Sequence, residues 1–481
     1  MQNNKRIKIG LEIHAQLTSL KSKLFCSCSA DYRRMEVNSS ICPICVGHPG
    51  TLPVLNSNAV SGALKIAIAL RSKPSTNIIF YRKNYFYPDL PKNFQISQYD
   101  KAGGIPLSTG GFLDVKDGVI VRIRRIQLEE DPGRLAYEGN ITNSPHILVD
   151  YNRSGIPLVE IVTEPDLDNP KQARIFLQKL KSILEHLGVC DGGLDGALRC
   201  DANISVSNGG RVEIKNINSL KGVERALSFE IARQTFPTSR SPTSMETRHW
   251  DNDRRVTVSL RVKEKDEDYR YFPEPDLVPI EVTKELVAEV KSVMPELPEQ
   301  RRKRFIDQFE ISTEVADVLT AEKAMADFFE KCCKIHSSPL RFGGWVAGVI
   351  QGYLNKIKKE FLELDLDAKD LSSLSAMVDA GDLTEMKAKE ILLEALQKST
   401  SPLANISTQK MISVAKENEV EDAIEEVFKK NPEAARDALN NGKAVNFLMG
   451  LLMKQTNGRA DPATAREAIK NKLSKMAESA N

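Results

Sequence analysis

Glu12 and His14 are two residues apart in the segment Lys8–Leu17, in which apolar and polar residues alternate. Side chains at this spacing share one face of a β-strand, with about 6.6–6.8 Å of rise between them, so both can lean toward one divalent cation. Glu160 lies in the apolar run Leu158–Glu164, where an unpaired charge is costly. The pattern is consistent with a magnesium site. A solvated polar pair without a chemical role is the alternative.

Further charged residues follow the predicted strands in the same way. They are Glu129 and Glu130 after Arg122, Arg124 and Arg125, then Arg199 with Asp201, and Glu213 with Lys215. Carboxylates that hold Mg²⁺ beside cations that neutralise phosphate oxygens suit the transfer of a phosphoryl group from ATP. The alternative is a set of solvated ion pairs, each contributing at most about 1 kcal/mol. Neither G-x-x-x-x-G-K-[ST] nor a helix-opening G-x-G-x-x-G occurs, so nucleotide binding would need an open-sheet site.

Four of the eight cysteines lie within 20 residues, as Cys26, Cys28, Cys42 and Cys45. In a reducing compartment such clustering favours a metal over disulfides. Two closely spaced pairs can supply the four thiolates of a tetrahedral zinc site, which would clip a loop and play a structural part. Unmetallated cysteines are the alternative, and His48 could replace one ligand.

Two basic segments admit two interpretations each. Tyr81–Lys92 interleaves aromatic residues with cations, which suits stacking on bases or sugars, or else packing of the aromatic rings in the core. Gln300–Arg304 is either a solvated helix face or a phosphate-binding patch. Cys332 and Cys333 lie on a helical pattern and are predicted to be packing residues.

The elements that must position these side chains are mostly antiparallel strands with one packed and one wetted face. Alternating segments are interrupted by a helix predicted over Pro170–Leu187, which opens after Asn169 and carries apolar residues at helical spacing. Runs of strands with covering helices indicate an α+β fold. The alternating segments are Lys8–Leu17, Val119–Leu128, His146–Tyr151, Leu158–Glu164, Leu198–Val206, Val212–Ile217 and Arg255–Lys263.

The periodicity of the apolar residues changes after the proline-rich segment Met294–Pro298. From there on, the spacing of apolar residues predicts helices. We expect a body over 1–295 with the cysteine loop at about 26–45, an all-α middle domain over 296–403 and a small all-α tail over 404–481. The polar break Lys398–Pro402 precedes the tail.

The 481 residues include 67 Lys+Arg and 65 Asp+Glu, with six His. Near-neutral charge argues against a polycation of the histone type but leaves local nucleic-acid contacts open. No apolar run approaches the roughly 20 residues that span a bilayer, and the first residues lack the apolar stretch of a secretory signal. We therefore expect a multidomain cytoplasmic protein with no membrane partner.

Long blocks of the sequence resemble the B subunit of the glutamyl-tRNA(Gln)/aspartyl-tRNA(Asn) amidotransferase, in matching order and essentially from end to end. The blocks are Ile9-Gly-Leu-Glu-Ile-His14, Arg82-Lys-Asn-Tyr-Phe-Tyr-Pro-Asp89, Phe94-Gln-Ile-Ser-Gln98, Leu128-Glu-Glu-Asp131, Leu158-Val-Glu-Ile-Val-Thr-Glu-Pro165, Leu198-Arg-Cys-Asp-Ala-Asn-Ile-Ser205, Glu213-Ile-Lys-Asn216 and Asp268-Tyr-Arg-Tyr-Phe-Pro-Glu-Pro275. The end of the chain, with Gly442-Lys-Ala-Val-Asn-Phe-Leu-Met-Gly450 and Gly458-Arg-Ala-Asp-Pro462, resembles the YqeY-like tail of this family.

The resemblance implies a cradle-shaped antiparallel-sheet body related to the glutamine synthetase and guanidino kinase fold. It implies an ATP- and Mg²⁺-dependent ligase reaction with glutamine as the nitrogen donor. The side-chain carboxylate of Glu or Asp misacylated on tRNA is phosphorylated, and ammonia from the A subunit then displaces phosphate. The implied partners are the A and C subunits of a heterotrimer and the misacylated tRNA, which the tail contacts, with the non-discriminating synthetase as a further candidate.

The resemblance also assigns residues. It implies magnesium ligands at Glu12, His14, Glu160 and one of Glu129 or Glu130, and places Lys83 at the tunnel or the mouth of the active site. Arg199, Asp201 and Lys215 are the predicted cofactor-binding residues on the neighbouring strands, and Cys26, Cys28, Cys42 and Cys45 the structural zinc ligands.

Two rival interpretations differ in what they leave unexplained. An archaeal-type paralogue specific for Glu-tRNA(Gln) would carry an additional inserted domain, for which this chain has no room. A non-catalytic zinc-ribbon tRNA-binding subunit would keep the cysteines but leave Glu12, His14 and Glu160 without a role.

Overall fold

The computed structural model describes residues 6–101, 104–115, 118–137, 144–207, 210–217, 219–235, 245–261, 266–408, 417–439, 442–456, 460 and 462–479. The chain divides into two compact units, Met1–Pro298 and Glu299–Asn481. No helix within the described ranges is both long and apolar enough to cross a membrane.

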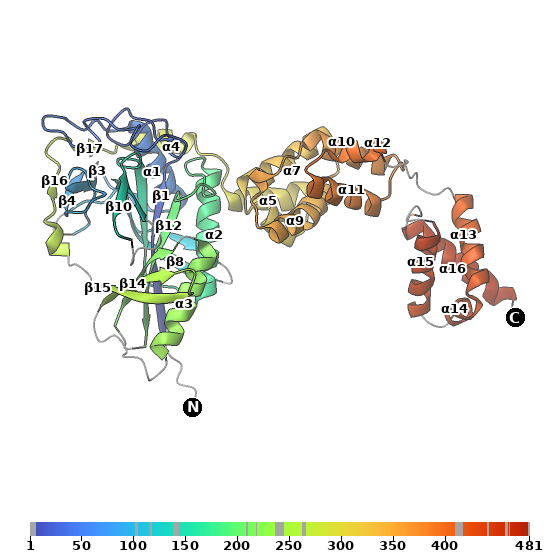
Figure 1. Ribbon diagram of the computed structural model, residues 1–481. Helices are drawn as coiled ribbons and strands as arrows, with labels where there is room; N and C mark the ends of the chain where they lie inside the picture. Colours follow the sequence, from blue (N-terminus) through green and yellow to red (C-terminus); the bar gives the residue numbers. More distant parts are fainter. Residues whose placement is uncertain are drawn as a thin grey trace. The chain divides into compact units, whose positions relative to one another are not determined.

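A large sheet organises the first unit (Figure 1). Its strands are β1 (Ile7–Gln16), β2 (Lys73–Pro74), β6 (Ser108–Thr109), β7 (Phe112–Asp114), β8 (Ile120–Glu130), β11 (Pro157–Thr163), β12 (Leu198–Val206), β13 (Val212–Ile217), β14 (Glu246–Asp251) and β15 (Val256–Arg261). Their order is β15-β14-β13-β12-β1-β11-β8-β6-β2, and β7 pairs with β8. The central position of β1 places its side chains between those of β11 and β12.

The structure confirms a mixed body of strands and helices, and each predicted alternating segment contains a strand. Val262 and Lys263, the end of the last predicted strand, lie outside the described residues. The expectation of purely antiparallel pairing is wrong at one place, because β13 and β14 are parallel. The helix α3 (Leu220–Thr235) joins these two strands, and such a crossover connection is what parallel neighbours require.

Shorter strands accompany the main sheet. They are β3 (Asn77–Ile78) with β17 (Ile280–Glu281), β4 (Tyr81–Asn84) with β5 (Phe94–Ser97) and β16 (Phe272–Pro273), and β9 (Arg134–Tyr137) with β10 (Ile147–Asp150). A short 3₁₀-helix, η1, covers Asp266–Tyr269. Side chains of β5 reach the end of β8, since Ser97 Oγ donates to Glu129 Oε2 over 2.7 Å.

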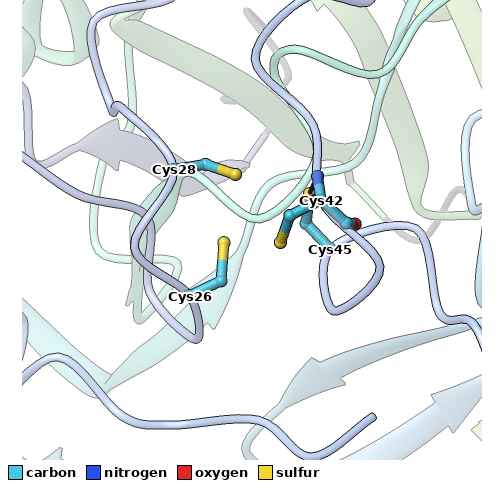
Figure 2. A group of neighbouring side chains, drawn as sticks. All are labelled: Cys26, Cys28, Cys42 and Cys45. Carbon is cyan, nitrogen blue, oxygen red and sulfur yellow. Dashed lines mark hydrogen bonds between the residues drawn. The ribbon is translucent and has the colours of Figure 1, made fainter.

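The loop between β1 and helix α1 (Ser57–Ala69) carries the four clustered cysteines (Figure 2). Gly47 in this loop has a φ of +71°, and a Cβ there would lie 2.5 Å from Cγ of Lys92. The loop therefore turns in a left-handed conformation directly against Lys92, two residues before β5, which only glycine accommodates without displacing Lys92.

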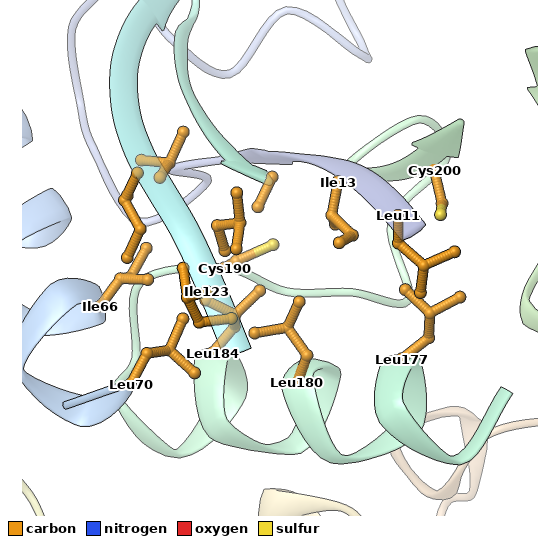
Figure 3. Packing of buried hydrophobic residues seen from close by; sticks show 14 of the residues in the cluster. Leu11, Ile13, Ile66, Leu70, Ile123, Leu177, Leu180, Leu184, Cys190 and Cys200 are labelled. Carbon is orange, nitrogen blue, oxygen red and sulfur yellow. The ribbon is translucent and has the colours of Figure 1, made fainter. Parts of the chain in front are cut away.

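The apolar layer lies on one face of the main sheet (Figure 3). Helix α2 (Pro170–His186) packs Leu177, Leu180 and Leu184 toward Leu11 and Ile13 of β1, and α1 and α3 contribute further buried residues. The Asn169 side chain caps α2 by accepting a hydrogen bond from the backbone N–H of Gln172, as its position before Pro170 predicts. A last helix of this unit, α4 (Lys284–Ser292), adds Val290 to the core.

Strand β8 departs from strict alternation, and the departure decides which arginine faces the polar side of the sheet. Ile123 pairs with Thr163, whereas Arg125 pairs with Val162, so one extra residue is accommodated between them. This bulge leaves the Arg124 side chain half-exposed and turns Arg125 to the same side as Gln127 and Glu129. The uniform alternation expected for Val119–Leu128 is therefore wrong at its centre.

Every secondary-structure element in the described part of the second unit is a helix, as predicted for 299–400. Its helices are α5 (Pro298–Phe309), α6 (Thr313–Leu319), α7 (Lys323–Ile335), α8 (Pro339–Gly344), the π-helical turn η2 (Trp345–Ile350), α9 (Gln351–Ile357), the 3₁₀ turn η3 (Phe361–Glu363), α10 (Ala368–Asp379), α11 (Glu385–Lys398), α12 (Pro402–Thr408), α13 (Glu417–Lys430), α14 (Pro432–Asp437), α15 (Gly442–Gln455) and α16 (Pro462–Ser479).

Two separate apolar clusters lie within this unit. One runs from Phe305 to Ile406 and the other from Val420 to Leu473. Cys332 is fully buried in the first cluster and Cys333 packs against it, which confirms the prediction that both are packing residues. The predicted boundary at 403/404 between a middle domain and a tail lies inside α12, whose Ile406 belongs to the first cluster, and its exact position stays a prediction.

Most cations of the basic run Gln300–Arg304 on α5 form ion pairs with neighbouring helices. Arg301 is buried and pairs with Asp327 and Glu330 of α7, at 2.6 and 3.1 Å. Arg304 also pairs with Glu330, and Arg302 pairs with Asp317 of α6. These partners engage three of its cations within the unit, whereas Lys303 is exposed, and both interpretations of the run stay predictions.

We predict that Leu180→Ala destabilises the first unit by about 2–5 kcal/mol, because the substitution leaves a cavity between α2 and β1. Leu180 is fully buried. Chemical denaturation followed by circular dichroism measures the change. Gln178→Ala, on the exposed side of the same helix, serves as the control and should change stability by less than about 0.5 kcal/mol. Equal effects of the two substitutions would contradict the assignment of the packed face.

Candidate functional site

A cluster of acidic residues surrounds His14 on the face of the sheet opposite the helices. The register places His14 directly opposite Glu160 on β11 and Arg199 on β12, while Glu12 lies opposite Asp201. Directly paired residues of antiparallel strands point to the same side, so pairing of three strands is enough to bring these side chains together.

The donor atoms of the cluster lie close enough for one cation. His14 Nε2 is 3.7 Å from Glu12 Oε1, 3.6 Å from Glu160 Oε2 and 3.9 Å from Glu129 Oε1. One ligand atom from each of Glu12, His14 and Glu160 lies within 4.8 Å of the others. Carboxylate oxygens suit Mg²⁺, which binds protein ligands at about 2.0–2.1 Å and usually retains several waters.

Burial and the interactions between neighbouring charges give the carboxyl groups of this cluster different pKa values. Burial opposes ionisation of Glu160, but its ion pair with His14 and the charge of Arg125 lower its pKa to about 2. Burial and the charge of Glu160 raise the pKa of Glu129 to about 7, and the same two causes raise that of Glu12. Burial alone would lower the pKa of His14, but the ion pair with Glu160 and the surrounding carboxylates raise it to about 9. The protonated imidazole thus holds the carboxylates together without a metal.

Two residues hold the carboxylates in place: Arg125, which the sequence marked only as one of three arginines in its segment, and Ser97, which it did not single out. Arg125 Nη2 donates to Glu160 Oε1 over 3.0 Å, and its Nη1 donates to Asp100 over 3.2 Å. Ser97 holds Glu129, as described above for β5. The bulge that turns Arg125 toward the cluster cannot be recognised from the pattern of apolar residues. The sequence therefore indicated only that several arginines lie in that segment, not which of them faces the cluster.

Glu130 lies apart from this cluster, although either Glu129 or Glu130 fitted the sequence. Lys92 Nζ donates to both Glu130 carboxylate oxygens, over 2.5 and 2.7 Å, and the backbone N–H of Ile96 donates to Oε1. Glu130 lines a cavity of about 270 Å³ together with Lys92 and Cys45. Because successive residues of a strand face opposite sides, only Glu129 reaches His14.

The expectation of a wetted polar face is wrong at its centre. Gln16, Glu129 and Glu160 are buried, and Glu12 and His14 are intermediate in exposure. The cover includes β5 and the cysteine loop, since Tyr32 of that loop accepts a hydrogen bond from Gln16. Long-range packing of this kind cannot be derived from the alternation of a single strand.

Lys83 on β4 is surrounded by tyrosine rings. Its Nζ lies 4.8 Å from the ring centre of Tyr269 and 5.6 Å from that of Tyr85. The Lys83 charge favours the ionised forms of Glu129 and Glu160. It contributes to the low pKa of Glu160 and partly opposes the rise in the pKa of Glu129, so the side chain lies within electrostatic reach of the cluster. The aromatic segment as a whole is mixed, since Tyr81 is buried whereas Phe86 and Tyr87 are exposed.

The three predicted cofactor-binding residues occupy the strands on the other side of β1. Lys215 Nζ lies 3.1 Å from Asp201 Oδ2 and 3.5 Å from Glu213 Oε1. Arg199 Nη2 lies 2.7 Å from Oδ1 of Asp131, which is fully buried. Asp201 and Lys215 lie beside Glu12 and influence its pKa in opposite directions, whereas Arg199 is directed toward the end of β8.

The four clustered cysteines face a common point (Figure 2). Their sulfur atoms all lie within 4.8 Å of one another. A tetrahedral site with zinc–sulfur distances of about 2.3 Å needs sulfurs roughly 3.8 Å apart, so small side-chain adjustments suffice. Hydrogen bonds from Cys26 and from the Cys42 backbone N–H outweigh burial and lower the pKa of Cys45 to about 4. His48 is exposed and outside this group.

Two family models match the chain. The model described as "GatB/GatE catalytic domain" matches residues 7–288, which include both the acidic cluster and the cysteines. The model described as "GatB domain" matches residues 327–473 of the helical unit. The first unit is thus of the class of amidotransferase catalytic domains.

Curated relatives are similar over nearly their whole length. The B subunit of aspartyl/glutamyl-tRNA(Asn/Gln) amidotransferase from Sulfurisphaera tokodaii is 47% identical, covering 97% of this chain and 99% of the relative. The proteins of the same name from Methanosarcina barkeri and Carboxydothermus hydrogenoformans are 44% and 40% identical, covering 98% and 97% of this chain and 99% and 98% of the relatives. The chain belongs to this family of amidotransferase B subunits. This confirms the resemblance and the predicted enzyme class.

We predict that Glu160→Gln lowers the pKa of His14 from about 9 toward its ordinary value of 6.5 in the metal-free chain. The substitution removes the ion-paired carboxylate that stabilises the imidazolium. Histidine NMR titration measures the shift, and Glu164→Gln, just beyond the end of β11, is the control. An unchanged His14 pKa in Glu160→Gln would contradict the described geometry.

The same shift predicts a pH dependence of stability. Because the folded-state pKa of His14 exceeds the unfolded-state value, its charge stabilises the metal-free fold fully below pH 6.5, and this contribution is lost as the pH rises through about 9. Denaturation midpoints measured from below the lower value to above the higher one check this. His14→Gln should remove that part of the dependence, and an identical pH profile for this variant would contradict it.

Proposed function

We propose that this chain catalyses the ATP-dependent step that converts Glu-tRNA(Gln), Asp-tRNA(Asn) or both into Gln-tRNA(Gln) and Asn-tRNA(Asn). The observation that carries the proposal is the convergence of Glu12, His14 and Glu160 within 4.8 Å, in a domain of the amidotransferase family. The relatives are named for both tRNAs, and either substrate fits the name.

The proposed reaction begins with transfer of the γ-phosphoryl group of ATP to the side-chain carboxylate of the misacylated amino acid. Ammonia then attacks the acyl carbon and phosphate leaves. A carboxylate is a poor electrophile because its leaving group would be oxide, whereas an acyl phosphate releases phosphate. Anchoring the amino acid through its tRNA supplies remote binding energy that positions the carboxylate.

The residues of the cluster suit this reaction by their charges. Bound Mg²⁺ would offset the negative charge of the phosphates during transfer. Glu12, His14, Glu129 and Glu160 would hold it, and Arg125 keeps Glu160 ionised and oriented. Lys215, beside Asp201, is a cation on the neighbouring strand for the nucleotide phosphates. Glu130 pairs with Lys92 and would support the site indirectly.

Lys83 and the tyrosines beside it offer a further part of the proposed site. Their position next to Glu129 fits a place at the mouth through which ammonia arrives, as the family resemblance implies. Burial of Glu129 and Glu160 limits the water that would hydrolyse a reactive acyl phosphate.

We infer that the chain works in the cytoplasm as a heterotrimer with the A and C subunits, in which the A subunit releases ammonia from glutamine. The body would share the cradle fold of glutamine synthetase and guanidino kinases. The helical tail would be YqeY-like and contact tRNA, and the second family model, which reaches residue 473, supports its place in the family.

The cysteine group would bind one structural zinc ion. The four sulfurs meet the requirement of a closed tetrahedral site, and the loop that carries them makes few regular backbone pairings of its own. The ion would fix this loop beside β8 and β5.

We predict that Glu12→Ala and Glu160→Ala each reduce Gln-tRNA formation roughly 10²–10³-fold, because transition-state charge loses its stabilisation. The assay supplies the purified complex with Glu-tRNA(Gln), ATP, Mg²⁺ and ammonium chloride, which bypasses glutamine hydrolysis. Glu164→Ala, a carboxylate of the same segment outside the cluster, should retain the wild-type rate.

Two results would contradict this assignment in different ways. Wild-type rates in both Glu12→Ala and Glu160→Ala would show that the site lies elsewhere. Failure of the intact complex to use ammonium would favour the zinc-ribbon tRNA-binding subunit without catalysis of its own.

We predict about one equivalent of zinc in the purified chain, and its loss in the double variant Cys26→Ser/Cys45→Ser. Elemental analysis by mass spectrometry measures the content. Cys333→Ser, which alters a packing residue of the helical unit, is the control and should retain the metal. A native preparation free of zinc that takes up none would overturn this part of the proposal.

A further inference from the structure

Lys23 is a fully buried lysine next to the cysteine group. Its side chain is 0% exposed and ranks among the largest fully buried side chains of the described residues. Its Nζ donates to Ser40 O over 2.9 Å, to Tyr151 O over 3.4 Å and to Cys45 Sγ over 3.7 Å. The ammonium group therefore contacts the sulfur of Cys45, a candidate metal ligand, and is not exposed to solvent.

Within the described part of the chain, no carboxylate neutralises this ammonium directly. Among the described residues, none has a carboxylate oxygen within 4.0 Å of Lys23 Nζ. Glu130, at the adjacent end of β8, is engaged by Lys92. Two carbonyl oxygens satisfy hydrogen bonds but do not supply a countercharge, and a buried cation without one is costly.

Lys23 also joins the two halves of the cysteine group. Its backbone N–H donates to Cys28 O over 2.9 Å, whereas its side chain reaches Ser40, two residues before Cys42, and the sulfur of Cys45. One residue thus contacts both cysteine pairs, through the backbone on one side and through the charge on the other.

We propose that Lys23 is the charge-compensating partner of the metal held by Cys26, Cys28, Cys42 and Cys45. A divalent ion with four thiolates carries a net charge of −2, which is the countercharge that the buried ammonium requires. Lys23 is then a positioning residue that donates an N–H···S hydrogen bond and is not itself a ligand. This inference rests on the proposed zinc site, and groups around a metal's ligands commonly tune its affinity.

The test compares zinc retention in the full-length chain with Lys23→Met, Lys23→Gln and Lys23→Arg. Gln keeps donors for the carbonyls but not the charge, whereas Arg keeps both. We expect Met and Gln to weaken zinc binding about 10- to 100-fold in competition with a chelator, and Arg to restore most of it. Lys21→Met, at an exposed lysine two residues away, is the matched control and should bind zinc like the wild type.

A spectroscopic readout separates charge from packing. In the cobalt-substituted chain, the thiolate-to-metal charge-transfer bands should shift in Lys23→Gln and Lys23→Met but not in Lys21→Met. Zinc affinity and cobalt bands identical to those of the wild type in folded Lys23→Gln would overturn the inference. If the wild-type chain takes up no zinc, the proposed zinc site itself is wrong. If the wild type and the Lys23 variants all bind zinc with equal affinity, only the proposed role of Lys23 is wrong.

A double-mutant cycle covers the case in which Lys23→Met folds poorly. Thermal unfolding is measured for Lys23→Met in the wild type and in the Cys26→Ser/Cys45→Ser background. Without the Cys45 sulfur and the metal the ammonium lacks its countercharge, so the substitution should lower Tm less in that background, or raise it. Equal lowering of Tm in both backgrounds would contradict the proposal.

Discussion

The structure depends on the packing of three carboxylates against one imidazole on the buried face of a sheet. Glu12, Glu129 and Glu160 lie on three adjacent strands with His14 between them, and burial opposes the full ionisation of all three. Without a metal, the protonated imidazole and Arg125 supply the compensating charge. A divalent cation would replace the proton, which makes the cluster a site whose ligands are assembled before the ion arrives.

The other elements of the first unit serve this arrangement. The apolar face of β1 packs on α2, which leaves the opposite face free for Glu12 and His14. The bulge in β8 turns Arg125 toward Glu160, and β5 supplies Ser97 to Glu129. The cysteine loop folds over the end of the same face, where Lys23 ties both cysteine pairs to Tyr151. The cysteine group and the acidic cluster are thus neighbours because of one sheet topology.

Local patterns predicted much of this arrangement and missed what depends on distant contacts. Alternation placed Glu12 and His14 on one strand face, and the apolar surroundings of Glu160 marked it as unusual. The choice between Glu129 and Glu130 required the cover from β5 and Lys92, which lie more than 30 residues away. The inward position of Arg125 and the burial of Lys23 could not be predicted, because a one-residue bulge and a buried ammonium leave no periodic signal. The helical unit followed from its pattern, whereas the ion pairs of Arg301 needed the packing of α5 against α7.

The central claim is that the groups around His14 bind one divalent cation with the imidazole as a ligand. Pulsed electron paramagnetic resonance of the full-length chain with one equivalent of Mn²⁺ and ¹⁵N-labelled histidine tests it most directly. We predict a single tightly bound Mn²⁺ coupled to one histidine nitrogen, with the coupling absent in His14→Gln. Tight binding without histidine coupling, or a coupling that persists in His14→Gln, would contradict the account.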